Sequence, residues 1–397
     1  MRIVYLHQYY TTPTEGGATR SYEFARRWAA AGHDVHVICG STPAIPPVNE
    51  TEETGVHVHR LPTEYHANMP TAKRLQAFMN FALRSSTRAR QLEPDAVYAT
   101  STPLTVAIPA RAATVWRPAG YVFEVRDLWP DIPIAMGYLG NPALRWASRR
   151  LEESAYFRAS HVVTLAPGMR DDICARGIPT HKVTVIPQGC DVDLFDELAG
   201  PNTETEPGWM QGRRVVLYAG ALGRANGVDL VVELAKEARL RAPELAFVVI
   251  GDGPEADSIR DAADAYGVLG VNYLQLSALP KTDISAWFRR ASATLALFRG
   301  PRVLWKDAVQ NKFFDSVSTG RPVFSNFNGW QTQIAEANGI GGQLDADPIG
   351  AVEQLAVAVS DQEWLMKVER SCRHLAAFEF NRDKQARAAL DILEALA

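Results

Sequence analysis

The chain has 397 residues, enough for two or three domains of ordinary size. Hydrophobic residues make up 47% of it and charged residues 22%, as in ordinary globular proteins, which excludes extended disorder and fibrous folds. Lysine and arginine number 41 against 45 aspartate and glutamate residues, so the formal net charge is -4. Because nucleic-acid-binding proteins normally carry a basic excess, we expect no nucleic-acid partner.

The four cysteines lie far apart, with no C-x-x-C pair and no histidine at ligand spacing. The sequence therefore predicts neither a disulfide framework nor a zinc site. The apolar run near the N-terminus is too short for a signal peptide, and no window approaches the length of a membrane span. We expect a soluble, cytoplasmic protein.

Short β-branched runs alternate with helical stretches along the first half of the chain. Strands are expected at 2–6, 34–39, 56–61, 95–99, 121–125, 161–165 and 183–186, and helices at 18–31, 71–91 and 142–158. Apolar strands that alternate with helices predict a parallel sheet covered on both faces.

Residues 198–212 interrupt this alternation with two prolines and three glycines, as an interdomain linker would. The alternation then restarts. Strands are expected at 214–218, 245–250, 271–274, 293–297 and 321–325, helices from 228 and 254, and only helix from 361 onward. We therefore expect an α/β protein with two doubly wound domains, at 1–197 and 213–375, and a closing helix at 376–397.

A glycine pair, Gly16-Gly17, follows the first strand and precedes a helix. Free N–H groups at a helix N-terminus favour an anionic ligand, and glycine lets the backbone approach it closely. A simple tight turn is the alternative. The segment lacks the G-x-G-x-x-G pattern of dinucleotide-binding enzymes, so a nicotinamide enzyme is disfavoured.

Asp307 and Asp315 bracket the segment DAVQNKFFD. Eight residues of helix would place the two carboxylates near one face, about two turns apart, where they could hold two hydroxyl-bearing parts of one ligand. A solvated helix face is the alternative for this spacing.

These segments resemble motifs of the family 4 glycosyltransferases of the GT-B fold. Asn311–Asp315 with Gly320–Val323 (NKFFD…GRPV) is similar to the family's N-K-x-x-E-Y-x-x-x-G-K-P-V segment, and Gly16-Gly17-x-x-Arg20 resembles its G-G-x-x-R loop. The segment EVRDLWP at 124–130 is similar to that of a subgroup that builds O-antigen, colanic-acid and capsular polysaccharides and includes N-acetyl-L-fucosamine transferases.

Two further turns resemble the family. IPQGCD at 186–191 is similar to I-P-N-G-V-D, and IGDGP at 250–254 to the family's G-x-G-P turn. The resemblance implies two Rossmann-like domains that face a cleft, with the acceptor in the first domain, the donor in the second, and the closing helix packed back on the first. It implies retaining transfer from a nucleotide sugar, commonly UDP-linked, to a glycan or lipid-linked acceptor, without an obligatory metal or other cofactor.

The resemblance also suggests roles for acidic residues. The second carboxylate of the family's E-x7-E pair, here Asp315, typically binds the ribose, and the first, here Asp307, lies beside the donor sugar. Both side chains are one methylene shorter than glutamate. Arg126-Asp127 falls where many relatives have His-Asp beside the donor sugar, so both are candidate catalytic residues; a helix N-cap is the alternative for Asp127.

Family members often neutralise the leaving diphosphate with an Arg and a Lys, at positions that here hold Ala221 and Asn226. A metal-free transferase still needs positive charge there, so we expect Arg224 and Lys312 to supply it. The full set of expected nucleotide-sugar-binding residues is Gly16, Gly17, Arg20, Arg224, Asn226, Gly251, Asn311, Lys312 and Asp315.

Two D-x-D segments, at 191–193 and 345–347, look like the cation-binding motif of another glycosyltransferase fold. The first lies in the IPQGCD loop after a strand and the second in a late loop, and we expect no metal at either.

From 65 to 92 the chain has no acidic residue and five basic ones, interleaved with apolar residues. Such a helix can lie on an anionic membrane surface, so we expect peripheral membrane contact; a domain helix with a solvated basic face is the alternative.

The sequence thus predicts a cytoplasmic-face glycosyltransferase that uses a UDP-sugar in surface polysaccharide or glycolipid assembly. Two alternatives remain: a UDP-N-acetylglucosamine 2-epimerase of the same fold, and a homologue that binds nucleotide sugars without turnover.

Overall fold

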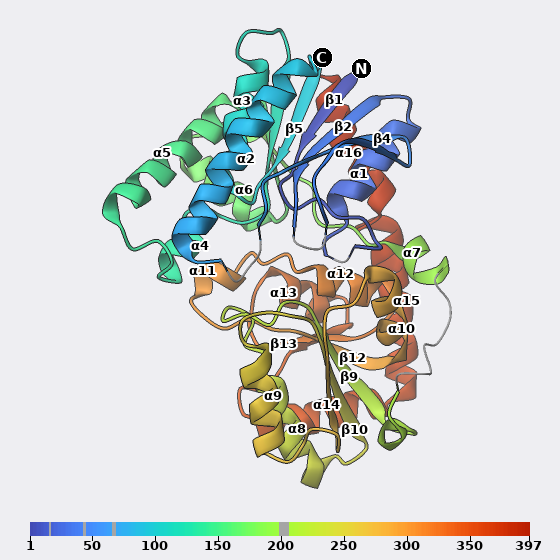
Figure 1. The fold of residues 1–397 in the computed structure, drawn as a ribbon. Coiled ribbons are helices and arrows are strands. Elements are labelled where there is room, and N and C mark those ends of the chain that lie inside the picture. Colours follow the sequence, from blue (N-terminus) through green and yellow to red (C-terminus); the bar gives the residue numbers. More distant parts are fainter. Residues whose placement is uncertain (16, 43–44, 66–68, 198–205) are drawn as a thin grey trace. The chain divides into compact units, whose positions relative to one another are not determined.

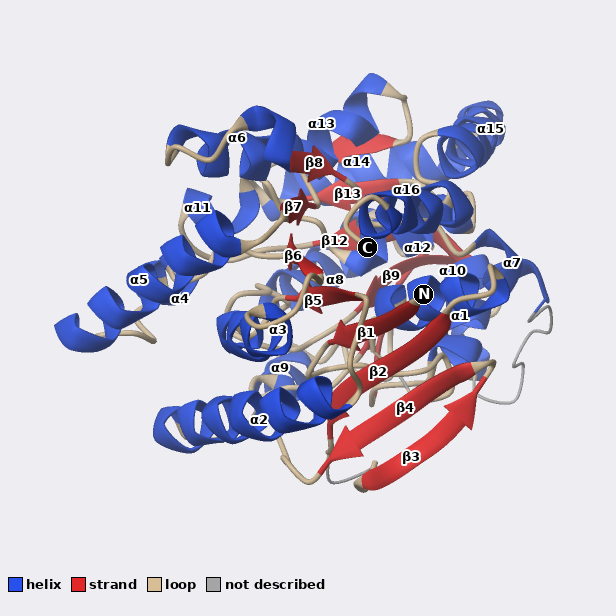
Figure 2. Ribbon diagram, turned by 90° about the horizontal axis from the view of Figure 1, so that it is seen from above, coloured by secondary structure: helices blue, strands red, loops and turns tan. Residues whose placement is uncertain are grey.

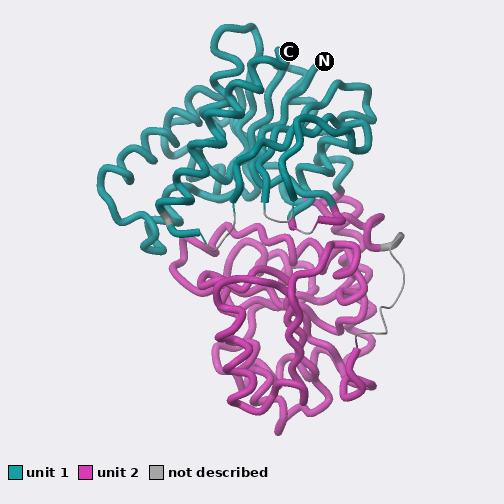
Figure 3. Tube along the Cα trace, in the orientation of Figure 1, with its two compact units in different colours: residues 1–12, 18–188, 382–397 teal, residues 13–17, 189–381 magenta. Residues whose placement is uncertain are grey.

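The computed structural model describes residues 1–15, 17–42, 45–65, 69–197 and 206–397 (Figure 1). The chain divides into two units (Figure 3). Unit 1 comprises Met1–Thr12, Ala18–Gln188 and Arg382–Ala397, and unit 2 comprises Pro13–Gly17 and Gly189–Asn381.

Unit 1 contains an eight-stranded sheet in the order β3-β4-β2-β1-β5-β6-β7-β8. Its strands are β1 (Arg2–Leu6), β2 (Asp34–Gly40), β3 (Val48–Glu53), β4 (Val56–Leu61), β5 (Ala96–Thr100), β6 (Gly120–Val125), β7 (His161–Thr164) and β8 (Val183–Val185). All neighbours pair in parallel except β3 and β4, which are antiparallel. The sequence did not predict β3, because its VNETEE segment is polar and mostly exposed at the edge of the sheet.

The helices of unit 1 cover both faces of this sheet (Figure 1). They are α1 (Arg20–Ala30), α2 (Thr71–Gln91), α3 (Ala107–Thr114), α4 (Asp131–Ala135), α5 (Pro142–Arg158), α6 (Pro167–Ala175) and α16 (Arg382–Glu394), with short 3-10 helices at Leu104–Val106 and Thr180–Lys182. The apolar faces of α1 and α16 share one core with the strands, and the Trp28 indole donates to the Ala386 carbonyl at 2.9 Å. The last residues of the chain therefore complete the core of the first unit.

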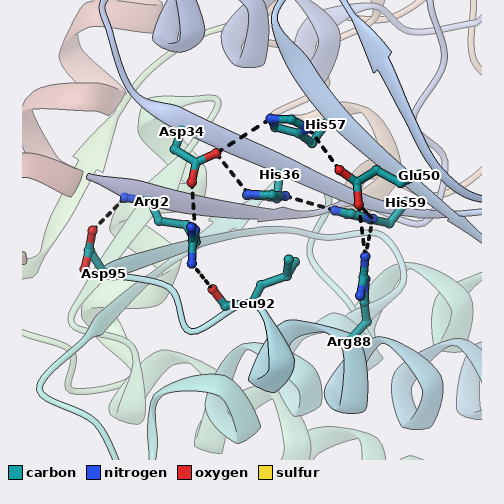
Figure 4. Close-up of polar contacts among 9 residues, drawn as sticks. All are labelled: Arg2, Asp34, His36, Glu50, His57, His59, Arg88, Leu92 and Asp95. Carbon is teal, nitrogen blue, oxygen red and sulfur yellow. Dashed lines mark hydrogen bonds and ion pairs between the residues drawn. The ribbon is translucent and has the colours of Figure 1, made fainter.

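A polar network lies on the other face of the sheet, across β2, β4 and β3 (Figure 4). The His36 ring stacks on His57, with centroids 4.7 Å apart, and on His59, with centroids 5.3 Å apart. His36 Nδ1 and His59 Nε2 are 3.0 Å apart and share a hydrogen bond. The stack forms because His36 pairs with His57 in the parallel register, and His59 follows two residues later on the same face.

Unit 2 contains a six-stranded parallel sheet in the order β11-β10-β9-β12-β13-β14. Its strands are β9 (Arg214–Ala219), β10 (Leu245–Ile250), β11 (Tyr273–Leu276), β12 (Ala291–Ala296), β13 (Val323–Ser325) and β14 (Gly341–Gln343), the last a short strand that the sequence did not predict. Its helices are α7 (Val192–Glu197), α8 (Asp229–Arg241), α9 (Ala256–Ala265), α10 (Lys281–Arg290), α11 (Arg302–Trp305), α12 (Asn311–Ser318), α13 (Trp330–Ala337), α14 (Pro348–Ser360) and α15 (Gln362–Phe378), with a 3-10 helix at Gly208–Met210. Helices lie on both faces of this sheet as well (Figure 2). The predicted fold class, two doubly wound α/β units, is confirmed.

The unit boundaries differ from the expected ones. Unit 1 ends at Gln188 rather than at 197, because the following residues pack within unit 2: Cys190 N donates to the Phe380 carbonyl at 2.7 Å, and Phe195 lies in the unit 2 core. Unit 2 continues to Asn381, beyond the expected end at 375. Of the expected linker, 198–205 lies outside the described residues, and Met210 is buried in the unit 2 core.

Candidate functional site

The order of the strands locates a candidate ligand site in unit 2. The chain winds outward in opposite directions from β9 and β12, which are neighbours. In open α/β sheets, ligands bind beyond the carboxyl ends of the strands at this switch point. The loops that leave these two strands, 220–227 and 297–310, therefore frame the candidate donor site.

Glycines allow the loops after β9 and β10 to touch. Gly251 has a φ of +156°, and a Cβ there would lie 1.8 Å from the Gly220 carbonyl oxygen. A Cβ on Gly253 would lie 2.3 Å from the Leu222 oxygen, and Leu222 N donates to the Asp252 carbonyl at 2.9 Å. Gly251, expected to bind the nucleotide sugar, is thus required first for the contact between two loop backbones.

Lys312 reaches the loop after β9 from the first turn of α12. The side chain is buried, and its Nζ lies 3.2 Å from the Tyr218 hydroxyl and 4.4 Å from the centre of that ring. A Cβ on Gly220 would lie 3.1 Å from the same nitrogen. Burial lowers the pKa of Lys312 to about 7, and attraction to Asp315 opposes the shift. A lysine whose pKa lies near neutrality is therefore buried beside the loop that frames the candidate site.

Asp315 lies one turn after Lys312 and is held by a lysine that sequence reasoning missed. Lys281 Nζ lies 3.0 Å from Asp315 Oδ1 and 2.8 Å from Asp191 Oδ2. The lysine and Asp191 side chains are only 8% and 3% exposed, and Asp315 is 15% exposed. Asp191, the first residue of a D-x-D segment, is thus a partner of a buried lysine. No motif marks Lys281 in the sequence, since it begins an ordinary amphipathic helix.

The expected shared helix face of Asp307 and Asp315 is wrong. Asp307 lies between α11 and α12, outside any helix, and its carboxylate is 3.0 Å from Lys306 Nζ. Hydrogen bonds to neighbouring segments hold this stretch in place: Trp330 N donates to the Lys306 carbonyl at 2.9 Å, and Gln310 Nε2 to the Leu297 carbonyl at 3.0 Å. These contacts delay the start of α12 until Asn311.

The remaining predicted donor residues lie at the same edge of the sheet. Arg224 is exposed in the loop after β9, and Asn226 closes a turn there, its N–H donating to the Gly223 carbonyl at 2.8 Å. Asn311 is the first residue of α12. Arg299 lies close by, but it pairs with Asp229 and Glu255 at the starts of α8 and α9.

Arg20 does not reach a ligand surface, which contradicts its expected binding role. Its side chain is fully buried in unit 1, with hydrogen bonds to Glu124 at 2.9 Å, the Pro187 carbonyl at 2.6 Å and the Ile186 carbonyl at 3.0 Å. Burial alone would raise the pKa of Glu124, but the Arg20 and Arg126 charges, together with hydrogen bonds from Arg20 and Tyr98, outweigh burial and lower that pKa. Arg20 therefore joins α1 to the strands.

Of the two glycines before α1, the structure describes only the second. Gly16 lies outside the described residues, and Gly17, with a φ of +108°, belongs to unit 2. The positive φ shows why glycine occupies position 17 but does not test its expected contact with a ligand.

Arg126 and Asp127 follow β6 in unit 1. Asp127 is exposed and does not cap a helix, since α4 begins only at Asp131, after Pro130. His7, which sequence reasoning missed, follows β1, and its Nδ1 lies 2.7 Å from the Ser21 hydroxyl. Burial, together with the nearby Arg126 charge, holds the pKa of His7 well below its ordinary value. A neutral imidazole therefore accompanies the Arg126-Asp127 pair.

Among the residues that the structure describes, no group of three or more histidine, cysteine, aspartate or glutamate side chains is arranged to hold a metal ion. In the second D-x-D segment, Asp347 N donates to Asp345 Oδ1 at 2.9 Å, and Asp347 precedes the first residue of α14. None of the described helices has the length and apolar character of a membrane span.

Comparison with known families identifies the chain. Residues 15–189 match the glycosyl transferase 4-like domain, and residues 202–298 match the glycosyl transferases group 1. The chain belongs to the family 4 glycosyltransferases. Its two units are the two Rossmann-like domains of the GT-B fold.

Two curated relatives of this glycosyltransferase match most of its length. WcaI of Escherichia coli (strain K12), named as a glycosyl transferase of colanic acid biosynthesis, is 23% identical over 70% of this chain and 72% of that protein. A protein named GDP-mannose-dependent alpha-mannosyltransferase, from Mycobacterium tuberculosis, is 26% identical over 61% of this chain and 60% of that protein.

Solved structures share the fold of this glycosyltransferase. Sucrose-phosphate synthase from Thermosynechococcus elongatus superposes with a TM-score of 0.78 at 14% identity, covering 100% of this chain and 98% of the other. Anabaena HepE in complex with UDP gives a TM-score of 0.69 at 14% identity, with both chains covered completely.

Proposed function

We propose that this glycosyltransferase moves a sugar, an N-acetylated hexosamine, from a UDP-sugar to an acceptor in surface polysaccharide or glycolipid assembly. We further propose that the anomeric configuration is retained and that no metal ion is required. The observation that carries the proposal is the position of Lys312 beside the loop after β9, with Asp315 one turn away on α12.

Each side chain has a distinct task in this proposal. Asp315 accepts hydrogen bonds from the ribose hydroxyls while Lys281 orients its carboxylate. Lys312 and Arg224 stabilise the negative charge that grows on the leaving diphosphate, which is the main electrostatic demand of a metal-free transfer. Arg126 and Asp127 contact the sugar or the acceptor hydroxyl.

The relatives support the class of pathway and leave the nucleotide to experiment. WcaI is named for colanic acid biosynthesis, a surface polysaccharide, and HepE was crystallised with UDP. The mycobacterial relative, in contrast, is named as GDP-mannose-dependent. A binding screen should therefore compare UDP-, GDP- and dTDP-sugars, and UDP-N-acetylhexosamines should bind most tightly.

Turnover then distinguishes the transferase from its alternatives. A transferase releases the nucleoside diphosphate only when an acceptor is present, and NMR of the product reports whether the anomeric configuration is retained. Conversion of the nucleotide sugar alone would indicate a 2-epimerase, and binding without any product a non-catalytic homologue. Loss of activity with a chelator would refute the metal-free mechanism.

We also propose peripheral contact with anionic membranes through residues 65–92, although the structure narrows the surface available. The interleaved Phe78 and Phe81 are buried in the core of unit 1, whereas Met79 and Leu83 are 45% and 63% exposed. A variant with Lys73, Arg74, Arg84 and Arg88 replaced by Gln should bind anionic vesicles more weakly at low salt, where surface charges are least screened. Equal binding by the variant and the wild type would favour a solvated basic face.

A further inference from the structure

A second recess opens in unit 1, away from the residues that follow its strands. It lies where β6 begins, between the last turns of α3 and α5, and has a volume of about 350 Å³. Arg126 and Asp127 follow the carboxyl end of the same strand. The recess is therefore at the opposite edge of the sheet from the residues assigned to sugar transfer.

Two arginines converge on this recess without a compensating acid. Arg111 lies in the last turn of α3 and Arg158 ends α5, and both line the recess, whose lining contains no carboxylate. Neither guanidinium has a hydrogen-bond or ion-pair partner among the residues that the structure describes. Two like charges that share one concave surface repel each other, and an anion placed between them would relieve the repulsion.

The charges of Arg111 and Arg158 both act on the Tyr121 phenol. Burial raises the pKa of Tyr121 to about 12, and the Arg111 and Arg158 charges both oppose that rise. Its hydroxyl donates to the Ala155 carbonyl at 3.3 Å, which fixes the ring. Both arginines, which come from two different helices, therefore lie near enough to this buried phenol for their charges to act on it.

The rest of the lining is suited to a small polar ligand. Ser160 contributes a hydroxyl group, and its backbone N–H is fixed by a 2.9 Å hydrogen bond to the Tyr121 carbonyl. The Thr114 hydroxyl also lines the recess, but it already donates to the Ala110 carbonyl at 3.1 Å. A Cβ on Gly120 would lie 2.7 Å from the Ser160 hydroxyl oxygen and 3.1 Å from Leu396 Cβ, so glycine is needed for these side chains to pack closely here. Arginine and hydroxyl groups together are the usual protein ligands of phosphate.

One exposed apolar side chain lines the recess, and two more adjoin lining residues in the sequence. Val115, which lines it, is 42% exposed, and the adjacent Trp116 is 87% exposed. Phe157, next to Arg158, is 56% exposed. Large apolar residues grouped around an anion site would contact the nonpolar part of an amphiphile or the edge of a bilayer.

We propose that this recess binds a phosphate-bearing ligand through Arg111 and Arg158, supplied either as a lipid headgroup or as a free phosphate compound. The site is separate from the donor site of unit 2 and does not depend on the proposed reaction.

The test compares wild type with the double variant Arg111→Gln/Arg158→Gln in the full chain. Both arginines are exposed, so the variant should keep the wild-type melting temperature. The control, Arg149→Gln/Arg150→Gln, also removes two positive charges, both from α5 and both outside the recess. The donor site is intact in the wild type and in both double variants, so pyrophosphate bound there contributes equally to all three, and only a difference between the two double variants reports on the recess.

Two measurements separate the sources of phosphate. Calorimetry with pyrophosphate tests a free ligand, and co-sedimentation with phosphatidylglycerol vesicles, against phosphatidylcholine vesicles, tests a headgroup. Loss of a charge-assisted hydrogen bond should weaken binding about ten-fold or more for each arginine. A selective loss in the recess variant supports the site, in the first assay for a free phosphate and in the second for a lipid. If the recess variant matches the wild type, or the control loses as much, the proposal is wrong.

Discussion

Lys312 is the buried lysine to which the proposed mechanism assigns the leaving diphosphate. Its Nζ has the Tyr218 hydroxyl at 3.2 Å, and the position that relatives fill with arginine is Ala221 here. We expect Lys312→Ala and Arg224→Ala each to lower kcat by about 10²–10³, the usual cost of losing one preorganised donor. Donor affinity should change less, because the charge develops mainly in the transition state.

Steady-state kinetics measures this effect, and Lys236→Ala, which removes an exposed lysine from α8, is the control. Near-normal turnover in both site variants would disprove the account of leaving-group stabilisation.

The pKa of Lys312 predicts that donor binding takes up a proton. In the free protein that pKa is about 7, so much of the side chain is neutral at pH 8. A bound diphosphate favours the charged form and raises the pKa, so the lysine gains a proton on binding. Calorimetry at pH 8 in buffers of different ionisation enthalpy should show net uptake in the wild type and none in Lys312→Ala. Equal uptake in both proteins would assign the proton elsewhere.

Asp315 tests nucleotide recognition. Asp315→Ala should weaken UDP binding by roughly 1.5–3 kcal/mol, the range for charge-assisted hydrogen bonds. Asp315→Glu should be tolerated, because relatives carry glutamate there. Unchanged UDP affinity in the Ala variant, with a normal melting temperature, would remove Asp315 from the site.

Sequence reasoning at this scale succeeded where one motif lies on one element. Asn311, Lys312 and Asp315 lie together at the start of α12, as their spacing predicts. It failed where contacts between distant parts of the chain determine the position of a side chain. Asp307 lies outside the helix, and Arg20 donates hydrogen bonds to carbonyl groups more than 160 residues away in the sequence. No local pattern encodes such partners.

At the scale of elements, the histidine stack makes the edge of the unit 1 sheet sensitive to acid. Burial lowers the pKa of His36 to about 4, from an ordinary 6.5, despite the Asp34 carboxylate, and also lowers the pKa of His59. The remaining charged or titratable groups of the network are Arg2, Glu50, His57, Arg88 and Asp95 (Figure 4).

Between pH 6.5 and 4 the unfolded chain binds a proton at His36 that the folded chain does not. The free energy of unfolding should therefore fall as the pH drops from 6.5 to 4, and His36 should account for about 3 kcal/mol of that loss. Below pH 4, His36 should cause no further loss. His36→Gln should flatten the dependence of the melting temperature on pH. An unchanged dependence would show that the stack does not control acid stability.

Two edge strands, one in each sheet, were not predicted from the sequence pattern. The apolar residues of β2 and β4 are visible in the sequence, whereas β3 lacks an apolar face and β14 is only three residues long. Both are edge strands of their sheets, where pairing needs little burial and leaves little periodic signal.

For the whole molecule, the sequence predicts two tandem α/β folds from the restart of alternation near residue 214. Periodicity does not show which sheet the last helix covers, because any amphipathic helix presents one apolar face. The packing partner is a tertiary property: the apolar face of α16 fills the unit 1 core beside α1. Unit 1 is thus built from both ends of the chain.

This arrangement predicts that damage to the last helix destabilises the first unit. Leu390 and Leu393 are 2% and 0% exposed, so Leu390→Ala or Leu393→Ala should each cost about 2–5 kcal/mol. Hydrogen exchange should speed up in α1 and in β1, which share the unit 1 core with α16, while the unit 2 strands β9 and β10 keep their protection. The control is Lys384→Ala, which replaces an exposed polar side chain on the same helix. Faster exchange confined to unit 2, or no change in β1 and α1, would contradict the role of α16. A helix that only covered the surface could lose its packing without reducing the protection of β1, which is distant from it in the sequence.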